Sequence, residues 1–96
     1  MIRIVRLTFK PEHVSDFEEL FEVRKTKIRQ ADGCEHVELW QDITNANAFY
    51  TYSIWQNESY LELYRNSELF KDTWATVKPW FAEKAIAYSV NKKETI

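Results

Sequence analysis

The chain has 96 residues, of which 45% are hydrophobic and 16% aromatic, and its formal net charge is −2. A chain of this length forms one domain, which we place at residues 1–96, and it buries only about 60–65% of its unfolded surface. No lysine- or arginine-rich run provides the basic face that nucleic-acid binding normally needs. No segment approaches the roughly 18 apolar residues of a membrane span, and no apolar signal-peptide core follows the first residues. Because Cys34 is the only cysteine, no intrachain disulfide can form, and we expect a cytoplasmic protein with neither nucleic-acid nor membrane partners.

Hydrophobic periodicity predicts four strands and three helices. Alternating patterns rich in β-branched and aromatic residues predict strands over residues 2–9, 34–42, 48–56 and 85–91. Apolar residues at helical spacing predict helices over residues 12–30, 58–65 and from Ser67 to about Phe81. The order β-α-β-β-α-α-β is typical of a ferredoxin-like α+β fold, in which a four-stranded antiparallel sheet carries its helices on one face.

Residues at the ends of the helical segments support these boundaries. Pro11 suits the first turn of a helix, and Asn57 and Ser67 are typical N-cap residues. Gly33 follows the first helical segment and is a helix-stop residue. Pro79 should bend or end the last helix, because proline removes a backbone donor and its ring clashes with the preceding turn.

The face of the predicted sheet that would normally meet water is apolar. It carries Ile2, Ile4, Trp40, Tyr50, Tyr52 and Ile54, with Tyr88 as a further candidate. An apolar sheet face of this size predicts a second sheet packed upon it. A second copy of the chain is its simplest source, so we expect a homodimer formed through Ile4, Trp40, Tyr50 and Tyr52.

Four residues with reactive or charged side chains have less evident roles. Arg6 lies on the same apolar face, and we expect it to pair with Glu38, either on a neighbouring strand or across the dimer. His36 shares a face with Glu38, but two residues are too few for a metal site, and a structural hydrogen bond is the simpler interpretation. Cys34 has no evident base partner, which favours a small buried residue over a nucleophile.

A second set of aromatic residues lies on the helix-facing side of the fold. Trp55 ends the third strand, while Tyr64, Phe70 and Trp74 recur along the two helices that follow. These four residues form either an aromatic clamp for a flat substrate or a filled core. The two alternatives are distinguished by volume, since a void of about 300 Å³ or more next to Trp55 favours a ligand pocket.

Three segments resemble the antibiotic biosynthesis monooxygenase family. They are LTFKPEHVSDFEELF (residues 7–21), ADGCEHVELWQD (31–42) and YSIWQNESYLELYRNSELF (52–70), and the similarity extends over nearly the whole chain. The resemblance implies a dimeric α+β barrel with a pocket between sheet and helices in each subunit. Members include cofactor-independent oxygenases of phenols and anthrones, and others that degrade haem.

Residue by residue, the resemblance is uneven. Trp55 matches the tryptophan that ends the third strand in both groups of oxygenases, whereas Tyr64 stands where many members have histidine. In the haem-degrading branch, Trp74 occupies the place of the iron ligand and Val5 that of an asparagine, so the resemblance argues against haem.

The resemblance thus implies a cofactor-independent monooxygenase without a metal, acting on a small phenol- or anthrone-type aromatic. Trp55, Tyr64, Phe70 and Trp74 would bind that substrate, and no residue stands out as the catalytic base. The alternative is a non-catalytic dimeric module of the same fold that binds a small molecule or is purely structural.

Overall fold

The computed structural model describes residues 1–96 and contains four strands, three α-helices and two short 3₁₀ turns. In chain order these are β1 (Ile2–Thr8), η1 (Pro11–His13), α1 (Val14–Arg29), β2 (Cys34–Gln41), β3 (Ala48–Trp55), α2 (Glu58–Arg65), α3 (Glu68–Val77), η2 (Lys78–Trp80) and β4 (Ile86–Val90). The strands form one antiparallel sheet in the order β2-β3-β1-β4. The predicted ferredoxin-like α+β fold is confirmed.

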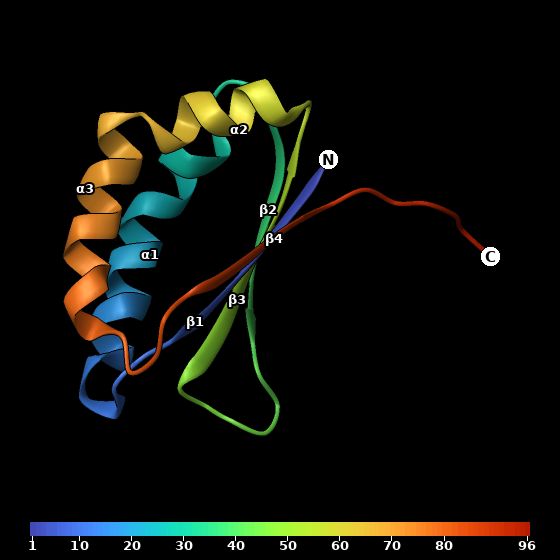
Figure 1. Cartoon of the computed structure of the whole chain (residues 1–96). Coiled ribbons are helices and arrows are strands. Elements are labelled where there is room, and N and C mark those ends of the chain that lie inside the picture. The colour runs from blue at the N-terminus through green and yellow to red at the C-terminus, as the bar shows by residue number, and fades with distance from the viewer.

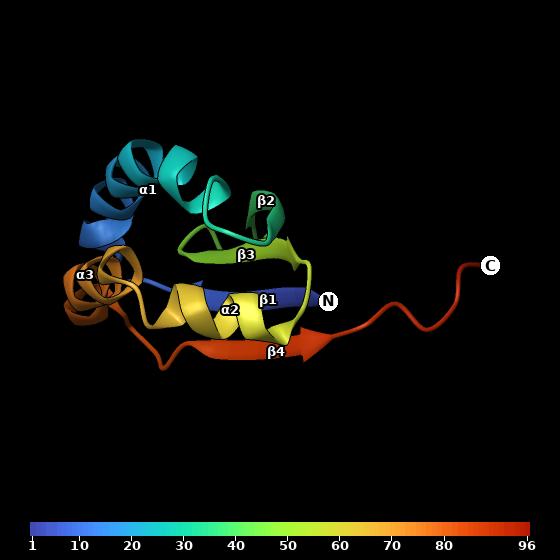
Figure 2. The ribbon, with the colours of Figure 1, turned by 90° about the horizontal axis from the view of Figure 1, so that it is seen from above.

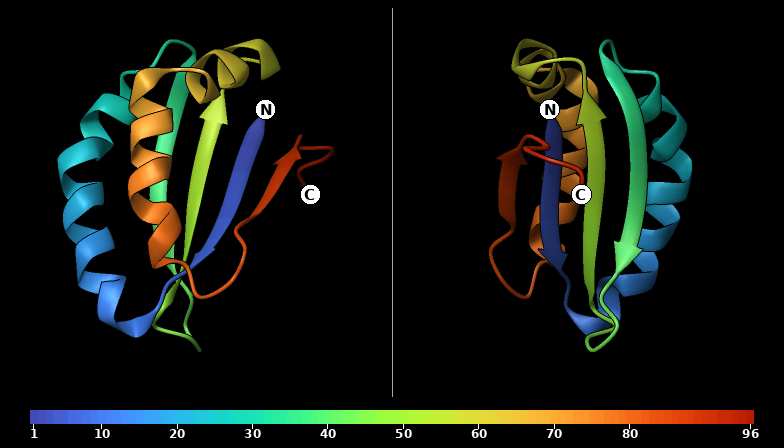
Figure 3. Two further views of the ribbon diagram at one scale, coloured as in Figure 1. Left: turned by 60° about the vertical axis from the view of Figure 1, so that its left-hand side comes forward. Right: turned by 90° about the vertical axis from the view of Figure 1, so that its right-hand side faces the viewer.

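The helices cover one face of the sheet and leave the other face bare (Figure 1). Helices α1 and α3 lie side by side over the sheet, and α2 crosses its end next to the tip of β3 (Figures 2 and 3). The right-hand view of Figure 3 shows the four strands with no element in front of them except the C-terminal tail, which leads away from the domain. The uncovered face is the one that the sequence predicts to be apolar.

The predicted helix boundaries are confirmed within a few residues. The side chain of Asn57 accepts a hydrogen bond from the Tyr60 amide, and that of Ser67 accepts one from the Phe70 amide, so both predicted N-caps are in place. Helix α3 ends at Val77, earlier than the predicted end near Phe81. The reason is Pro79, which falls in the 3₁₀ turn η2 and cannot continue the α-helical hydrogen-bond pattern.

Gly33 makes the tight connection between α1 and β2. Its φ angle is +77°, in the left-handed region that residues with a Cβ rarely adopt. A Cβ atom built on Gly33 would lie 2.2 Å from Cγ of Tyr60. The absence of a side chain therefore lets α2 approach the start of β2.

The buried core is small and consists of two separate clusters. The larger holds Leu7, Phe9, Phe17, Phe49 and Val77. The smaller holds Cys34, Trp55 and Leu61. Only 11 of the 96 residues are buried, which agrees with the limited core expected for a chain of this length.

The strand register places the predicted apolar residues together on the bare face. Ile4 lies opposite Tyr52 and Tyr88, while Tyr50 lies opposite Trp40. The rings of Trp40 and Tyr52 stack with centroids 4.8 Å apart. Trp40 is 40% exposed and Tyr88 is 55% exposed, so this face presents large rings to solvent in the single chain.

The expected pairing of Arg6 with Glu38 within the chain is wrong. Strand β3 separates β1 from β2, so Arg6 lies opposite Tyr50 and has no ion pair. Glu38 instead accepts hydrogen bonds from His36 and from the Trp40 indole, which confirms a structural role for His36. The buried Nε of Arg6 has no hydrogen-bond partner in the chain.

Candidate functional site

A cavity of about 360 Å³ lies between the sheet and the helices. Fourteen of its 19 lining residues are hydrophobic. It borders both core clusters, since Leu7, Phe17 and Val77 of the larger cluster and Trp55 and Leu61 of the smaller one contribute to its wall. The volume exceeds the roughly 300 Å³ at which a ligand pocket becomes a better interpretation than a filled core.

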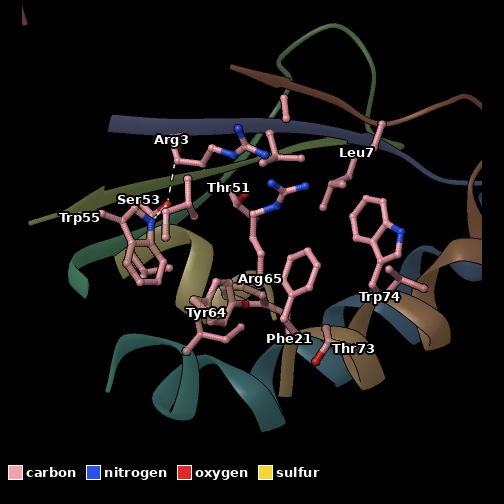
Figure 4. A pocket seen from close by; sticks show the side chains of 18 of the residues that line it. Arg3, Leu7, Phe21, Thr51, Ser53, Trp55, Tyr64, Arg65, Thr73 and Trp74 are labelled. Carbon is pink, nitrogen blue, oxygen red and sulfur yellow. Dashed lines mark hydrogen bonds between the residues drawn. The ribbon is translucent and has the colours of Figure 1, made fainter. Parts of the chain in front are cut away.

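All four aromatic residues selected from the sequence line this cavity, and they contact one another in series. Trp55 stacks on Tyr64 with ring centroids 5.1 Å apart, and Tyr64 meets Phe70 edge-on at 5.3 Å. Phe70 in turn stacks on Trp74 at 5.9 Å with an angle of 7° between the ring planes. The four rings thus form a continuous aromatic wall from the end of β3 along α2 and α3. Figure 4 labels three of its members, Trp55, Tyr64 and Trp74.

Trp55 is the most deeply buried member of this wall, with 1% of its surface exposed. Its indole N–H donates a hydrogen bond to Oγ of Ser53 at 2.9 Å, which satisfies its one polar atom and fixes the ring plane. Tyr64 covers one face of the ring, and Trp55 lines the cavity and belongs to the smaller core cluster at the same time. Phe70 and Trp74 are only partly buried.

Tyr64 contributes a hydroxyl group to a largely apolar environment. Burial, with a smaller contribution from the nearby Cys34, raises the pKa of Tyr64 to about 12. The hydroxyl therefore stays protonated at neutral pH and can donate a hydrogen bond, but it cannot accept a proton as a general base. The resemblance described above places Tyr64 where many family members have histidine. In this chain the position therefore holds a neutral hydrogen-bond donor, the tyrosine hydroxyl.

The polar lining of the cavity includes residues that the sequence reasoning did not select. They are Arg3, Thr51, Ser53, Arg65 and Thr73. The alternation of strand β1 already places Arg3 on the helix-facing side with Val5 and Leu7. No comparable signal marks Arg65, because a charged residue in the last turn of a helix is usually a solvated one.

None of the lining residues is a carboxylate, histidine or cysteine. Cys34 is buried in the smaller core cluster, and burial raises the pKa of its thiol, so it remains a neutral packing residue. His36 and Glu38 lie on the opposite face of the sheet from Val37, which lines the cavity. No group of three or more His, Cys, Asp and Glu side chains is arranged to hold a metal ion.

The geometry agrees with the comparison to known proteins. The antibiotic biosynthesis monooxygenase family matches residues 1–76, that is, the elements from β1 to most of α3, and the chain belongs to this family. No curated protein matches the sequence.

Solved structures show the same fold. A conserved protein from Methanosarcina mazei Go1 has a TM-score of 0.89 at 22% identity, with 96% of this chain and 92% of that chain covered. A structure described as an antibiotic biosynthesis monooxygenase has a TM-score of 0.89 at 17% identity, covering 98% and 100%. A protein from Pseudomonas aeruginosa has a TM-score of 0.79 at 22% identity, covering 95% and 93%. At these identities the similarity establishes the fold alone.

No helix of the structure combines the length and the apolar character that a membrane crossing needs.

Proposed function

We propose that this protein is a cofactor-independent monooxygenase that oxidises a small, flat phenol- or anthrone-type aromatic in the cavity between sheet and helices. The observation that carries the proposal is the void of about 360 Å³ walled by the aromatic series from Trp55 to Trp74. Flat rings can stack on Phe70 and Trp74, whose planes are nearly parallel.

The chemistry requires electrons from the substrate and an environment that excludes water. An ionised anthrone is electron-rich enough to reduce dioxygen, so that one oxygen atom is retained as a new carbonyl and the other leaves as water. The chain would supply an apolar cavity, a fixed ring orientation and one hydrogen bond from the Tyr64 hydroxyl to the substrate oxygen. Since the lining offers no general base, the substrate must be acidic enough to lose its proton to solvent.

The experiment that tests the proposal measures dissolved oxygen and product mass with a panel of flat phenols and anthrones. Wild-type protein should consume oxygen and place one atom of ¹⁸O₂ in the product. Trp74→Ala should lower this activity because it removes an orienting ring. A variant on the exposed surface of α1, Val23→Ala, serves as the control and should retain full activity. Oxygen consumption no greater than the uncatalysed rate for the whole panel would contradict the proposal.

A second candidate function is binding of a small aromatic without chemistry. The observation that favours it is the absence of a carboxylate, imidazole or thiol from the cavity wall. In this case the panel would quench tryptophan fluorescence saturably while oxygen consumption stayed at the background rate.

We also propose that the protein is a homodimer formed through the bare face of the sheet. The face carries Ile4, Tyr50 and Tyr52, the 40% exposed Trp40 and the 55% exposed Tyr88. Large exposed rings on an uncovered sheet are typical of an interface. The partnerless Nε of Arg6 lies on the same face, and a second copy could supply the acceptor that the single chain lacks.

A further inference from the structure

Two arginine side chains enter the otherwise apolar cavity from opposite sides. Arg3 projects from β1 and Arg65 from the last turn of α2, and both line the cavity. Figure 4 shows their guanidinium groups in the middle of the pocket, between the sheet above and the aromatic wall below. Two cations in a wall that is mostly hydrocarbon require an explanation, since desolvating a charge is costly.

The chain itself compensates this pair of charges only in part. Arg3 donates a hydrogen bond of 2.9 Å to Oγ of Ser89, a neutral acceptor, and it has no ion pair. Arg65 pairs with Glu62 at 2.7 Å, but both side chains are about half exposed, and surface pairs of this kind contribute little. No Asp or Glu lines the cavity, so neither arginine has a carboxylate partner inside it, and Glu62 acts on them from outside the wall.

The two guanidinium groups also affect each other. Burial lowers the pKa of Arg3, and the positive charge of Arg65 lowers it further, while the carboxylate of Glu62 acts in the opposite direction. Both side chains line the same cavity and their guanidinium groups lie in its middle (Figure 4), so one ligand can contact both. An anion placed between them would offset both the repulsion and the desolvation.

We propose that the cavity binds a planar aromatic carboxylate, with the carboxylate held by Arg3 and Arg65 and the ring packed against Phe70 and Trp74. A carboxylate is favoured because its two oxygens match the planar fork of a guanidinium group, which donates two parallel hydrogen bonds. The inference rests on the proposed function, because it specifies the ligand class of the same cavity.

The test compares two ligands of almost equal shape that differ in charge, 2-naphthoate and 2-naphthamide. Their affinities are measured by titration calorimetry for wild-type protein, Arg3→Gln, Arg65→Gln and the control Lys71→Gln. Lys71 is exposed on α3 and does not line the cavity, so its replacement removes one positive charge without changing the wall. Unchanged naphthamide affinity in each variant shows that its cavity is intact.

We expect wild type to bind naphthoate at least about tenfold more tightly than naphthamide, since hydrogen bonds to charged groups are stronger than neutral ones. Arg3→Gln and Arg65→Gln should each reduce this preference to about threefold or less, and Lys71→Gln should retain it. If Arg3→Gln does not fold, Arg65→Gln alone decides, because the Arg65 side chain is about half exposed and its replacement should not disturb folding.

Three results would overturn the inference, and they have different consequences for the proposed function. Equal binding of both ligands to wild type would refute the anion site while leaving an aromatic pocket. A naphthoate preference that survives in both arginine variants would place the anion elsewhere. Failure of both ligands to bind at millimolar concentration would refute the anion site and the aromatic pocket together.

Discussion

The indole ring of Trp55 stacks on the phenol ring of Tyr64, with centroids 5.1 Å apart and 28° between the ring planes. This contact joins the end of β3 to α2, and both rings line the cavity. It also brings the protonated Tyr64 hydroxyl to the cavity wall. The stability of the fold and the shape of the site therefore depend on the same pair of rings.

Replacing Trp55 with alanine should destabilise the protein strongly. The side chain is 99% buried and its N–H is hydrogen-bonded to Ser53, so the change leaves a cavity and removes a buried hydrogen bond. We expect a loss of about 3–5 kcal/mol in the free energy of unfolding, measured by urea denaturation. A loss below about 1 kcal/mol would mean that the Trp55 indole is not part of the core. Trp74→Ala, at a partly buried position, is for this reason the better variant for activity measurements.

The ionisation of Tyr64 should be separable from that of the other tyrosines. An unperturbed tyrosine has a pKa near 10, and Tyr64 is raised to about 12. When the tyrosinate absorbance is followed with rising pH, the wild type should therefore show an additional increase near pH 12. Tyr64→Phe should lack this increase. A titration complete by about pH 11.5 in the folded protein, as unperturbed tyrosines alone would give, would contradict the buried environment of this hydroxyl.

The same shift makes stability depend on pH. Because the folded-state pKa of Tyr64 lies above the unfolded value, its contribution is fully present below pH 10 and is lost as the pH rises towards 12. The loss amounts to about 2–3 kcal/mol. Thermal melts of wild type and Tyr64→Phe across this range should diverge, with the wild type losing more stability as the pH rises. Parallel curves would show that Tyr64 is not the group responsible.

Gly33→Ala should destabilise the turn between α1 and β2. The substitution adds a Cβ at a φ of +77° and 2.2 Å from Cγ of Tyr60. We expect a cost of about 1–3 kcal/mol in thermal or urea unfolding, whereas the neighbouring exposed Asp32→Ala should change stability by no more than about 0.5 kcal/mol. Equal stabilities of the two variants would mean that α2 does not approach Gly33 this closely.

Tyr52→Glu should disrupt the proposed homodimer. The substitution places a carboxylate opposite Ile4 and next to Glu38, in the middle of the bare face, where burying an unpaired charge is costly. Light scattering after gel filtration should give twice the chain mass of 11.6 kDa for wild type and the single mass for Tyr52→Glu. The control Val23→Glu, at a residue 74% exposed on α1, should remain dimeric. A monomeric wild type would refute the interface.

The sequence was sufficient to predict the fold because local signals agree with one another. The caps at Asn57 and Ser67, the turn at Gly33 and the alternation of the strands each identified an element that the structure contains. The end of α3 was misplaced by a few residues. The apolar pattern continues through Trp80 and Phe81, but Pro79 turns that part of the chain into a 3₁₀ segment.

The candidate site could be predicted only in part. Four aromatic residues at strand and helix spacing suggested one wall, and the structure brings their side chains together. Whether rings at such positions fill a core or leave a void depends on the distances between the packed elements, and the periodicity of a sequence does not give these distances. The presence of Arg3 and Arg65 in one cavity was missed for a related reason, since the two residues are far apart in sequence and line the same space only because of the position of α2. The prediction that Arg6 pairs with Glu38 within the chain was wrong because the alternation along a strand does not reveal which strands are neighbours in the sheet.

The measurement that tests the central claim most directly is a fluorescence titration with 2-naphthol, a flat neutral aromatic, on a variant whose cavity is filled. Thr51 lies on the central strand β3 and lines the cavity, so Thr51→Phe should occupy the void. Thr26→Phe makes the same change at an exposed position of α1. We predict saturable quenching of tryptophan fluorescence in wild type and Thr26→Phe, and its loss in Thr51→Phe. Equal binding by all three proteins, or no saturable quenching in wild type, would show that the space beside Trp55 is not a ligand site.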